Sequence, residues 1–252
     1  MILHDSHACL PSRQVLTYLC WAQWAFGVAL QGTQYVIISM DETFVNSTMP
    51  FGDGFVAQGQ AWGLTDPRRT RPQVDHADVR TSLLATVCSC AALQPHLPQV
   101  FLPRGRPGGA MPANQVPAWE AQRYPHECWT GTAGFVTTTT MIRWAAHVRS
   151  VVSSFNASLW IVLVMDCCTA HLDMRFLQHL RRLKILFLIV PAKLTWLVQL
   201  LDVYVLAELK QMLRDGLAKE LLKSTSCSVS LHRRLHVMAT AVRKTSGGAR
   251  LE

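Results

Sequence analysis

The stretch "LWIVLVMDCCTAH", residues Leu159 to His171, joins seven apolar side chains to a cluster of reactive ones. A continuous apolar run of this length is typical of a strand that is buried on both faces. The run ends at Asp166, and Cys167, Cys168 and His171 follow within five positions. The stretch therefore predicts a buried strand over 159–165 that carries a carboxylate to its end.

The flanking segments predict alternating strands and helices. Strands are expected at Tyr35–Met40 and Lys184–Val190, and a β-hairpin at Val79–Cys90 with Gln94–Gly105. Apolar residues at helical spacing predict helices over about 11–32, over 139–152, around 172–180, and from Val203 through the leucine stripe that ends at Leu221. This order favours a mixed sheet with helices packed on it.

Three aspartates share one sequence context, because each follows an apolar segment. Asp41 ends "YVIISM", Asp166 ends "LWIVLVM" and Asp202 follows "TWLVQLL". A carboxylate at the end of a buried strand is costly unless it is paired, and a divalent cation is a strong partner for it. Aspartate is also favoured as a helix cap or turn residue. Each of the three aspartates, taken alone, could therefore be a metal ligand or a cap or turn residue.

The eight cysteines favour reduced thiols in an intracellular protein, because they include no CxxC pair and no regular framework. Cys88 with Cys90, and Cys167 with Cys168, lack the usual spacing of zinc ligands, and buried free cysteine behaves as a small hydrophobic residue. Cys167 and His171 could form a nucleophile pair, but the sequence marks no orienting partner for them.

Three blocks occur in the order of a known family. "SMDET" (39–43), "VMDCCTAH" (164–171) and "PAKLTWLVQLLDVYVLAELK" (191–210) resemble the signature blocks of the DDE superfamily endonuclease domain, in the pogo-like branch of the mariner-type transposases. Residues 80–105 resemble the family's central hairpin, and residues 128–148 its helix before the second aspartate. The resemblance covers roughly Tyr35 to Leu222.

The resemblance implies an α/β fold, namely a ribonuclease H-like mixed β-sheet flanked by helices. It implies that Asp41, Asp166 and Asp202 are catalytic and bind two Mg²⁺ or Mn²⁺ ions. The family's supporting positions correspond to Glu42, His171, Thr195, Gln199 and Lys210. The implied function is metal-dependent DNA cleavage and strand transfer in the nucleus, and it is compatible with a homodimer.

Two departures from the family pattern support a second hypothesis. Cys167 replaces the usual asparagine, and Leu200 replaces a proline. The 34 residues before the first strand leave no room for the family's N-terminal DNA-reading region, so we expect a helical remnant (1–34), a catalytic domain (35–222) and a basic tail (223–252) whose composition is typical of disorder. The alternative function is therefore an inactive, domesticated or decaying transposase fragment that binds nucleic acid or another partner.

The composition agrees with an anionic partner and not with a membrane span. The net charge is +8, from 24 Lys and Arg against 16 Asp and Glu, which favours an anionic partner such as nucleic acid or an acidic membrane face. The apolar segment 183–201 is the one candidate membrane span in the sequence, but Lys184, Lys193 and Pro191 interrupt it. We therefore expect no membrane association.

Overall fold

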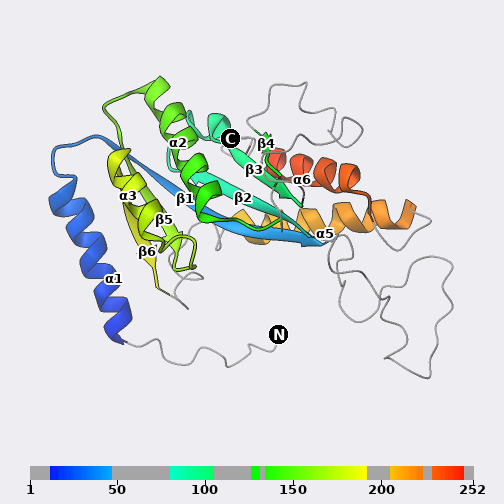
Figure 1. Cartoon of the computed structure of the whole chain (residues 1–252), viewed down its shortest axis with the longest axis horizontal. Helices are drawn as coiled ribbons and strands as arrows, with labels where there is room; N and C mark the ends of the chain where they lie inside the picture. Colours follow the sequence, from blue (N-terminus) through cyan, green and yellow to red (C-terminus); the bar gives the residue numbers. More distant parts are fainter. Residues whose placement is uncertain are drawn as a thin grey trace. The chain divides into compact units, whose positions relative to one another are not determined.

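The computed structural model describes residues 12–46, 80–104, 126–130, 134–191, 205–223 and 229–246 (Figure 1). The helices are α1 (Ser12–Trp24), its π-helical continuation η1 (Ala25–Ala29), the 3₁₀ turn η3 (Gln94–His96), α2 (Thr138–Phe155), α3 (Met174–Arg182), α5 (Leu206–Lys223) and α6 (Leu231–Ser246). The strands are β1 (Tyr35–Asn46), β2 (Arg80–Cys88), β3 (Gln99–Pro103), β4 (His126–Cys128), β5 (Trp160–Asp166) and β6 (Ile185–Val190).

The six strands form one mixed sheet in the order β4-β3-β2-β1-β5-β6. Strands β1, β5 and β6 are parallel, β2 and β3 form the antiparallel hairpin, and β4 runs parallel to β3. The predicted mixed α/β sheet with flanking helices is confirmed, as are the strand after Leu159 and the hairpin.

Three features differ from the sequence expectations. Strand β1 continues to Asn46, so Asp41 lies inside a strand and not at its end. The short strand β4 lies in a stretch for which no element was expected. Helix α6 occupies much of the segment from 223 onward, because Leu235, Met238 and Val242 form a buried face that outweighs the polar composition.

The chain divides into two compact units that interleave along the sequence. The first contains residues 1–41, 86–97 and 137–205, and the second contains residues 42–85, 98–136 and 206–252. The expected division into segments 1–34, 35–222 and 223–252 stays a prediction, since these units group residues by contacts within the fold and not by chain order.

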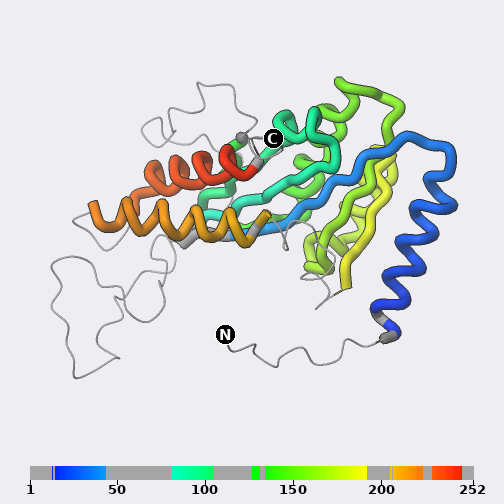
Figure 2. Tube along the Cα trace, turned by 180° about the vertical axis from the view of Figure 1, so that it is seen from behind, coloured from blue at the N-terminus to red at the C-terminus, as the bar shows by residue number. Residues whose placement is uncertain are grey.

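In the first unit, α1 and η1 cover one face of the parallel strands (Figure 2). Ala25 and Leu30 are buried against Val162 and Val164 of β5, and against Leu188 and Val190 of β6. The indole N–H of Trp21 donates to the carbonyl of Phe187 at 3.3 Å, which ties the helix to β6. Alternate residues of β5 therefore face α1.

The intervening residues of β5, namely Ile161, Leu163 and Met165, are also buried. Because successive side chains of a strand point to opposite faces, this unit is covered on both sides. Helices α2 and α3 contact each other, and α3 contacts β6. The sequence of β5 is continuously apolar because the side chains on both faces of this strand are buried.

The junction between α2 and β5 is held by one arginine. Arg149 donates from Nη1 to the carbonyl of Leu159 at 2.5 Å and from Nη2 to the carbonyl of Ala157 at 2.6 Å. A planar guanidinium holds its N–H donors in a fixed fork, so it binds the two carbonyls in one defined geometry. This clamp sets the start of β5 and, seven residues later, the position of Asp166.

The second unit is built on β3, α5 and α6. All five residues of β3 are buried, and α6 contacts that strand. Helix α5 presents Leu209, Leu213 and Leu217 as its buried stripe, which confirms the predicted amphipathic helix over its described part. None of the helices in the described part of the chain is both long enough and apolar enough to cross a membrane.

Candidate functional site

Two of the three predicted aspartates come from neighbouring parallel strands. The register pairs Ser39 of β1 with Val164 of β5. Asp41 and Asp166 each follow two residues further along their strands, so a continued register would bring them level. Neighbouring strands lie about 4.8 Å apart, and residues of equal register point to the same face. Both carboxylates are half-buried. The register therefore predicts that the two carboxylates lie side by side.

That face of the sheet is the one that α1 covers farther back along the strands. Ile37 of β1 and Val162 and Val164 of β5 share the face with the two aspartates, and all three pack in the α1 cluster. Asp166 lies two residues after Val164 on the same face of its strand. Packing of the apolar residues against α1 sets which face of each strand they occupy, and it therefore also sets the face on which the aspartates lie.

His171 holds the carboxylate of Asp166. Its ring Nδ1 lies 2.6 Å from Oδ1 of Asp166 and 3.2 Å from the backbone carbonyl of the same residue. The histidine side chain is 1% exposed, while that of Asp166 is 32% exposed. A turn makes this contact, because the N–H of His171 donates to the carbonyl of Cys168 at 3.1 Å. With an ionised acceptor, Nδ1 carries the proton and donates it.

The surroundings keep Asp166 ionised. Burial is the largest single influence and raises the pKa of this carboxyl, but three others oppose it: the hydrogen bond from His171, the charge of that ring and the N–H of Cys168. Their net effect is a pKa below the usual value of Asp. A carboxylate must be deprotonated to bind a metal ion, so Asp166 is prepared for this role at neutral pH.

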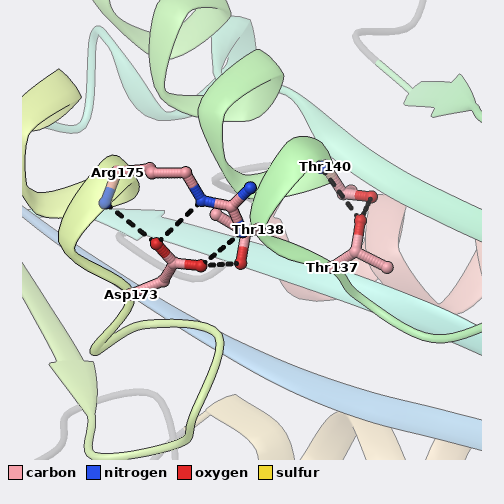
Figure 3. Close-up of polar contacts among 5 residues, drawn as sticks. All are labelled: Thr137, Thr138, Thr140, Asp173 and Arg175. Atoms are coloured by element: carbon pink, nitrogen blue, oxygen red, sulfur yellow. Dashed lines mark hydrogen bonds and ion pairs between the residues drawn. The ribbon is translucent and has the colours of Figure 1, made fainter.

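The far end of the same loop is anchored to two helices, as Figure 3 shows. Asp173 caps α3, since the N–H of Arg175 donates to its Oδ1 at 2.9 Å. The Arg175 side chain and the hydroxyl of Thr138 donate to Oδ2 at 2.7 and 2.9 Å. These donors hold the pKa of Asp173 far below its usual range. Thr138 begins α2, so the loop is tied to that helix as well.

Thr137 caps α2 beside this anchor. Its hydroxyl accepts from the N–H of Thr140 at 3.2 Å, and the two hydroxyls lie 3.0 Å apart (Figure 3). Sequence reasoning did not single out Thr138, Asp173 or Arg175. The signal was present, because an aspartate directly before a helical apolar face is the usual N-cap pattern. The loop 167–172 is thus held at both ends.

The remaining predicted residues are distributed as follows. Thr195, Gln199 and Asp202 lie outside the described residues, so the third aspartate stays a prediction. Glu42 and Lys210 are half-buried on β1 and α5, in the second unit. Of the predicted site residues, the contact that the described structure shows within the first unit is that of His171 with Asp166.

The chemistry of this donor set fits a hard divalent cation. Asp41 and Asp166 offer carboxylate oxygens, which Mg²⁺ and Mn²⁺ prefer, and the pKa shift keeps Asp166 charged. His171 orients one of the two carboxylates in the way that buried partners orient metal ligands. Strand residues hold such groups more rigidly than loop residues do.

A comparison with protein families found one match. The profile described as "DDE superfamily endonuclease" matches residues 109–244, which is more than half of the chain. The matched range contains Asp166, His171, Asp202 and Lys210, while Asp41 precedes it. A search of curated protein sequences found no match.

The solved structures with a similar fold include several of the Mos1 transposase. A pre-cleavage Mos1 transpososome is 12% identical with a TM-score of 0.46, and the match covers 96% of this chain and 63% of that one. The Mos1 strand transfer complex is 13% identical with the same TM-score, and the match covers 95% and 62%. The chain thus spans less than two thirds of the length of these proteins.

Proposed function

Because the chain belongs to the DDE superfamily of endonucleases, we propose that it cleaves and joins DNA phosphodiester bonds with Mg²⁺ or Mn²⁺. Asp41, Asp166 and Asp202 are the proposed metal ligands. The observation that supports the proposal is the parallel register of β1 with β5, which pairs Ser39 with Val164; continued by two residues along each strand, it would set Asp41 beside Asp166 on one face. Two bound ions would activate water or a 3′-hydroxyl and stabilise the leaving oxygen.

The protein's own side chains do the positioning. His171 donates to Oδ1 of Asp166, so this carboxylate is held in one orientation and is kept ionised. The capped start of α3 and the clamp at Arg149 hold the two ends of the β5 region. Rigid placement of ligands is the main requirement of this chemistry, since the reaction asks little of proton-transferring side chains.

The substrate, the location and the assembly follow the same proposal. The net charge of +8 supports DNA as the substrate, because phosphate neutralisation by Lys and Arg supplies most non-specific binding energy. A nuclear location and a homodimer belong to the proposal through the family, and Thr195, Gln199, Lys210 and Glu42 are its supporting residues.

A metal-dependent nicking assay tests the activity. We expect nicking of supercoiled DNA to require Mg²⁺ or Mn²⁺, and Asp166→Asn and Asp41→Asn to reduce it to the metal-free level. Asp215→Asn is the matched control, since Asp215 is an exposed residue of α5 whose carboxylate accepts from Gln211 at 2.9 Å. Equal nicking by the wild type and by Asp166→Asn would contradict the proposal.

A second candidate function is an inactive descendant that keeps the fold and binds nucleic acid or a partner protein. Cys167 favours it, because this residue directly follows the metal-binding Asp166 and replaces the asparagine of the family pattern. The same assay separates the two functions: an inactive descendant binds DNA without nicking it in either metal. Restoration of nicking by Cys167→Asn would identify this position as the cause.

A further inference from the structure

Two cysteines flank a bend at the end of β2. Cys88 is the last residue of the strand, the chain bends at Ser89, and Cys90 follows. The N–H of Cys90 donates to Sγ of Cys88 at 3.3 Å, so the first sulfur lies against the backbone of the second cysteine. Residues two apart in an extended strand have Cα atoms about 6.6 Å apart, and a bend shortens this distance into the range of disulfides.

Ser89 ties the bend to the neighbouring strand β1. Its N–H donates to the carbonyl of Ile37 at 2.9 Å, and its hydroxyl accepts from the N–H of Ile37 at 3.2 Å. The middle residue of the Cys-Ser-Cys sequence is thus held through both its backbone and its side chain. The two flanking cysteines are therefore kept at a fixed spacing.

Gln94 closes the other side of the turn. Its Oε1 accepts from the N–H of Cys88 at 2.5 Å, and its Nε2 donates to the carbonyl of Thr86 at 3.2 Å. Its own N–H donates to the carbonyl of Cys90 at 3.0 Å. All of these residues lie in the first unit. A turn that is already ordered in this way loses little further entropy when a bond closes across it.

The two thiols differ in their access to solvent. Cys90 is exposed, whereas Cys88 is half-buried. Burial is the main cause that raises the pKa of the Cys88 thiol to about 11; the N–H of Cys90 lowers this pKa, and the charge of the Cys90 thiolate raises it. Cys88 therefore stays protonated near neutral pH. Because oxidation follows exposure and thiolate character, an oxidant in solution meets Cys90 first.

We propose that Cys88 and Cys90 form a reversible disulfide by exchange with a low-molecular-weight disulfide. The thiolate of Cys90 attacks one sulfur of this reagent, forms a mixed disulfide and expels one small thiolate. The sulfur of Cys88 then loses its proton, attacks Sγ of Cys90 and expels the second small thiolate. Two protein thiols are oxidised, the reagent is reduced to two thiols, and these take up the two protons. The proposal does not depend on the proposed function.

Mass spectrometry of the full chain, equilibrated with oxidised and reduced glutathione, tests the pair. The remaining thiols are blocked with N-ethylmaleimide, and the chain is cut after Lys and Arg. Peptide 81–104 then contains Cys88 and Cys90 and no other cysteine. It should lack two hydrogens and carry neither glutathione nor maleimide. Cys20, which is exposed on α1, is the control and should carry glutathione. Glutathione or maleimide on peptide 81–104, when Cys20 carries glutathione, would overturn the proposal.

Two substitutions test the order of the steps. Cys88→Ser should trap the mixed disulfide, so that Cys90 carries one glutathione. In Cys90→Ser, the remaining Cys88 should react with oxidised glutathione at least tenfold more slowly than Cys90 does in Cys88→Ser, because a half-buried thiol is less accessible. Equal rates would contradict the assigned order. The measurement on the unmodified chain is independent of how well either variant folds.

The contribution of the fold is measured in urea. At one glutathione ratio, the ratio of disulfide to dithiol in peptide 81–104 should be at least tenfold higher when the chain is oxidised in its folded state than in urea. Excess reduced glutathione should restore maleimide labelling of both cysteines. An equal ratio in urea, or a disulfide that resists reduction, would show that the ordered turn does not provide a reversible site.

Discussion

Asp166 depends on His171 for both its orientation and its charge. The 2.6 Å contact between Nδ1 and Oδ1 leaves the second carboxylate oxygen to point away from the ring. His171 is 1% exposed and is held by the turn at Cys168, so it cannot follow a carboxylate that rotates. Loss of the ring would free Asp166 to turn and would remove a hydrogen bond to its ionised form.

We therefore predict that His171→Ala weakens metal binding more than it weakens the fold. The Mg²⁺ concentration for half-maximal nicking should rise about 10–100-fold, as is usual when a residue that orients a metal ligand is lost. His171→Gln, whose amide can still donate, should recover part of the loss. His236→Gln is the control, since His236 is exposed on α6. An unchanged metal dependence in His171→Ala would show that the contact is merely structural.

The lowered pKa of Asp166 also predicts how the stability of the fold depends on pH. Its folded-state pKa lies below its unfolded-state value of about 3.9. Its contribution is therefore complete above pH 4 and is lost as the pH falls through the lower, folded-state pKa. The unfolding free energy of the wild type, measured in urea, should drop more steeply below pH 4 than that of Asp166→Asn. Parallel curves would contradict the pairing with His171.

At the scale of elements, the close contact of α5 with α6 depends on one small residue. Gly216 lies in the middle of α5, and a Cβ at this position would lie 2.6 Å from Cγ1 of Val237 on α6. Val237 is β-branched and nearly buried, so its side chain has little freedom to rotate away. The glycine allows a close approach of the helices and costs α5 about 1 kcal/mol of helix propensity relative to alanine.

Gly216→Ala should therefore destabilise the second unit despite its better helix propensity. Overpacking of this kind costs about 1–3 kcal/mol, which outweighs the gain in propensity. In the Val237→Ala background the clash is absent, so the same substitution should become stabilising by up to about 1 kcal/mol. Urea unfolding of the four proteins of this cycle measures the difference. Additive effects would show that the two helices do not meet at this point.

At the scale of the whole molecule, the excess of basic residues would dominate the nucleic-acid binding that we propose. Some of the basic residues form ion pairs with acidic residues, and others do not in the described part of the chain. Arg233 and Lys223 pair with Glu220, whereas Arg181 and Arg182 are exposed at the end of α3. The ion pairs hold the pKa of Glu220 below its usual value. Arg181 and Arg182 are therefore better candidates for phosphate contacts than Arg233 is.

Affinity for duplex DNA should fall steeply with salt, by about a thousandfold between 50 and 200 mM if about six phosphates are contacted. Replacing Arg181 and Arg182 with Ala should reduce the slope of log K against log salt by about 1.8, which is 0.9 for each lost contact. Arg233→Ala should leave the slope nearly unchanged. A slope that is the same in the double variant and in the wild type would remove these two arginines from the DNA interface.

Much of the fold could be predicted from local patterns. Residues that are buried in these elements repeat at short, regular spacing along the sequence, so a local pattern predicts them. This holds for the apolar run 159–165, the apolar faces of α2 and α3, and the leucine stripe of α5. The same patterns failed for β4, which is short and pairs with β3 through three residues. Helix α6 was missed for another reason: Leu235, Met238 and Val242 lie at helical spacing, but the polar composition around them favoured disorder.

By itself, the sequence determined which residues could be chemically important, because family blocks and the ends of apolar runs mark Asp41 and Asp166 individually. Only the tertiary structure decided that their two strands are parallel neighbours, although 125 positions separate the aspartates, since this depends on the pairing of β1 with β5. It also decided that His171 folds back onto Asp166 and that Cys168 approaches the same ring. Such contacts arise from long-range burial and turn geometry, which no local pattern of side chains encodes.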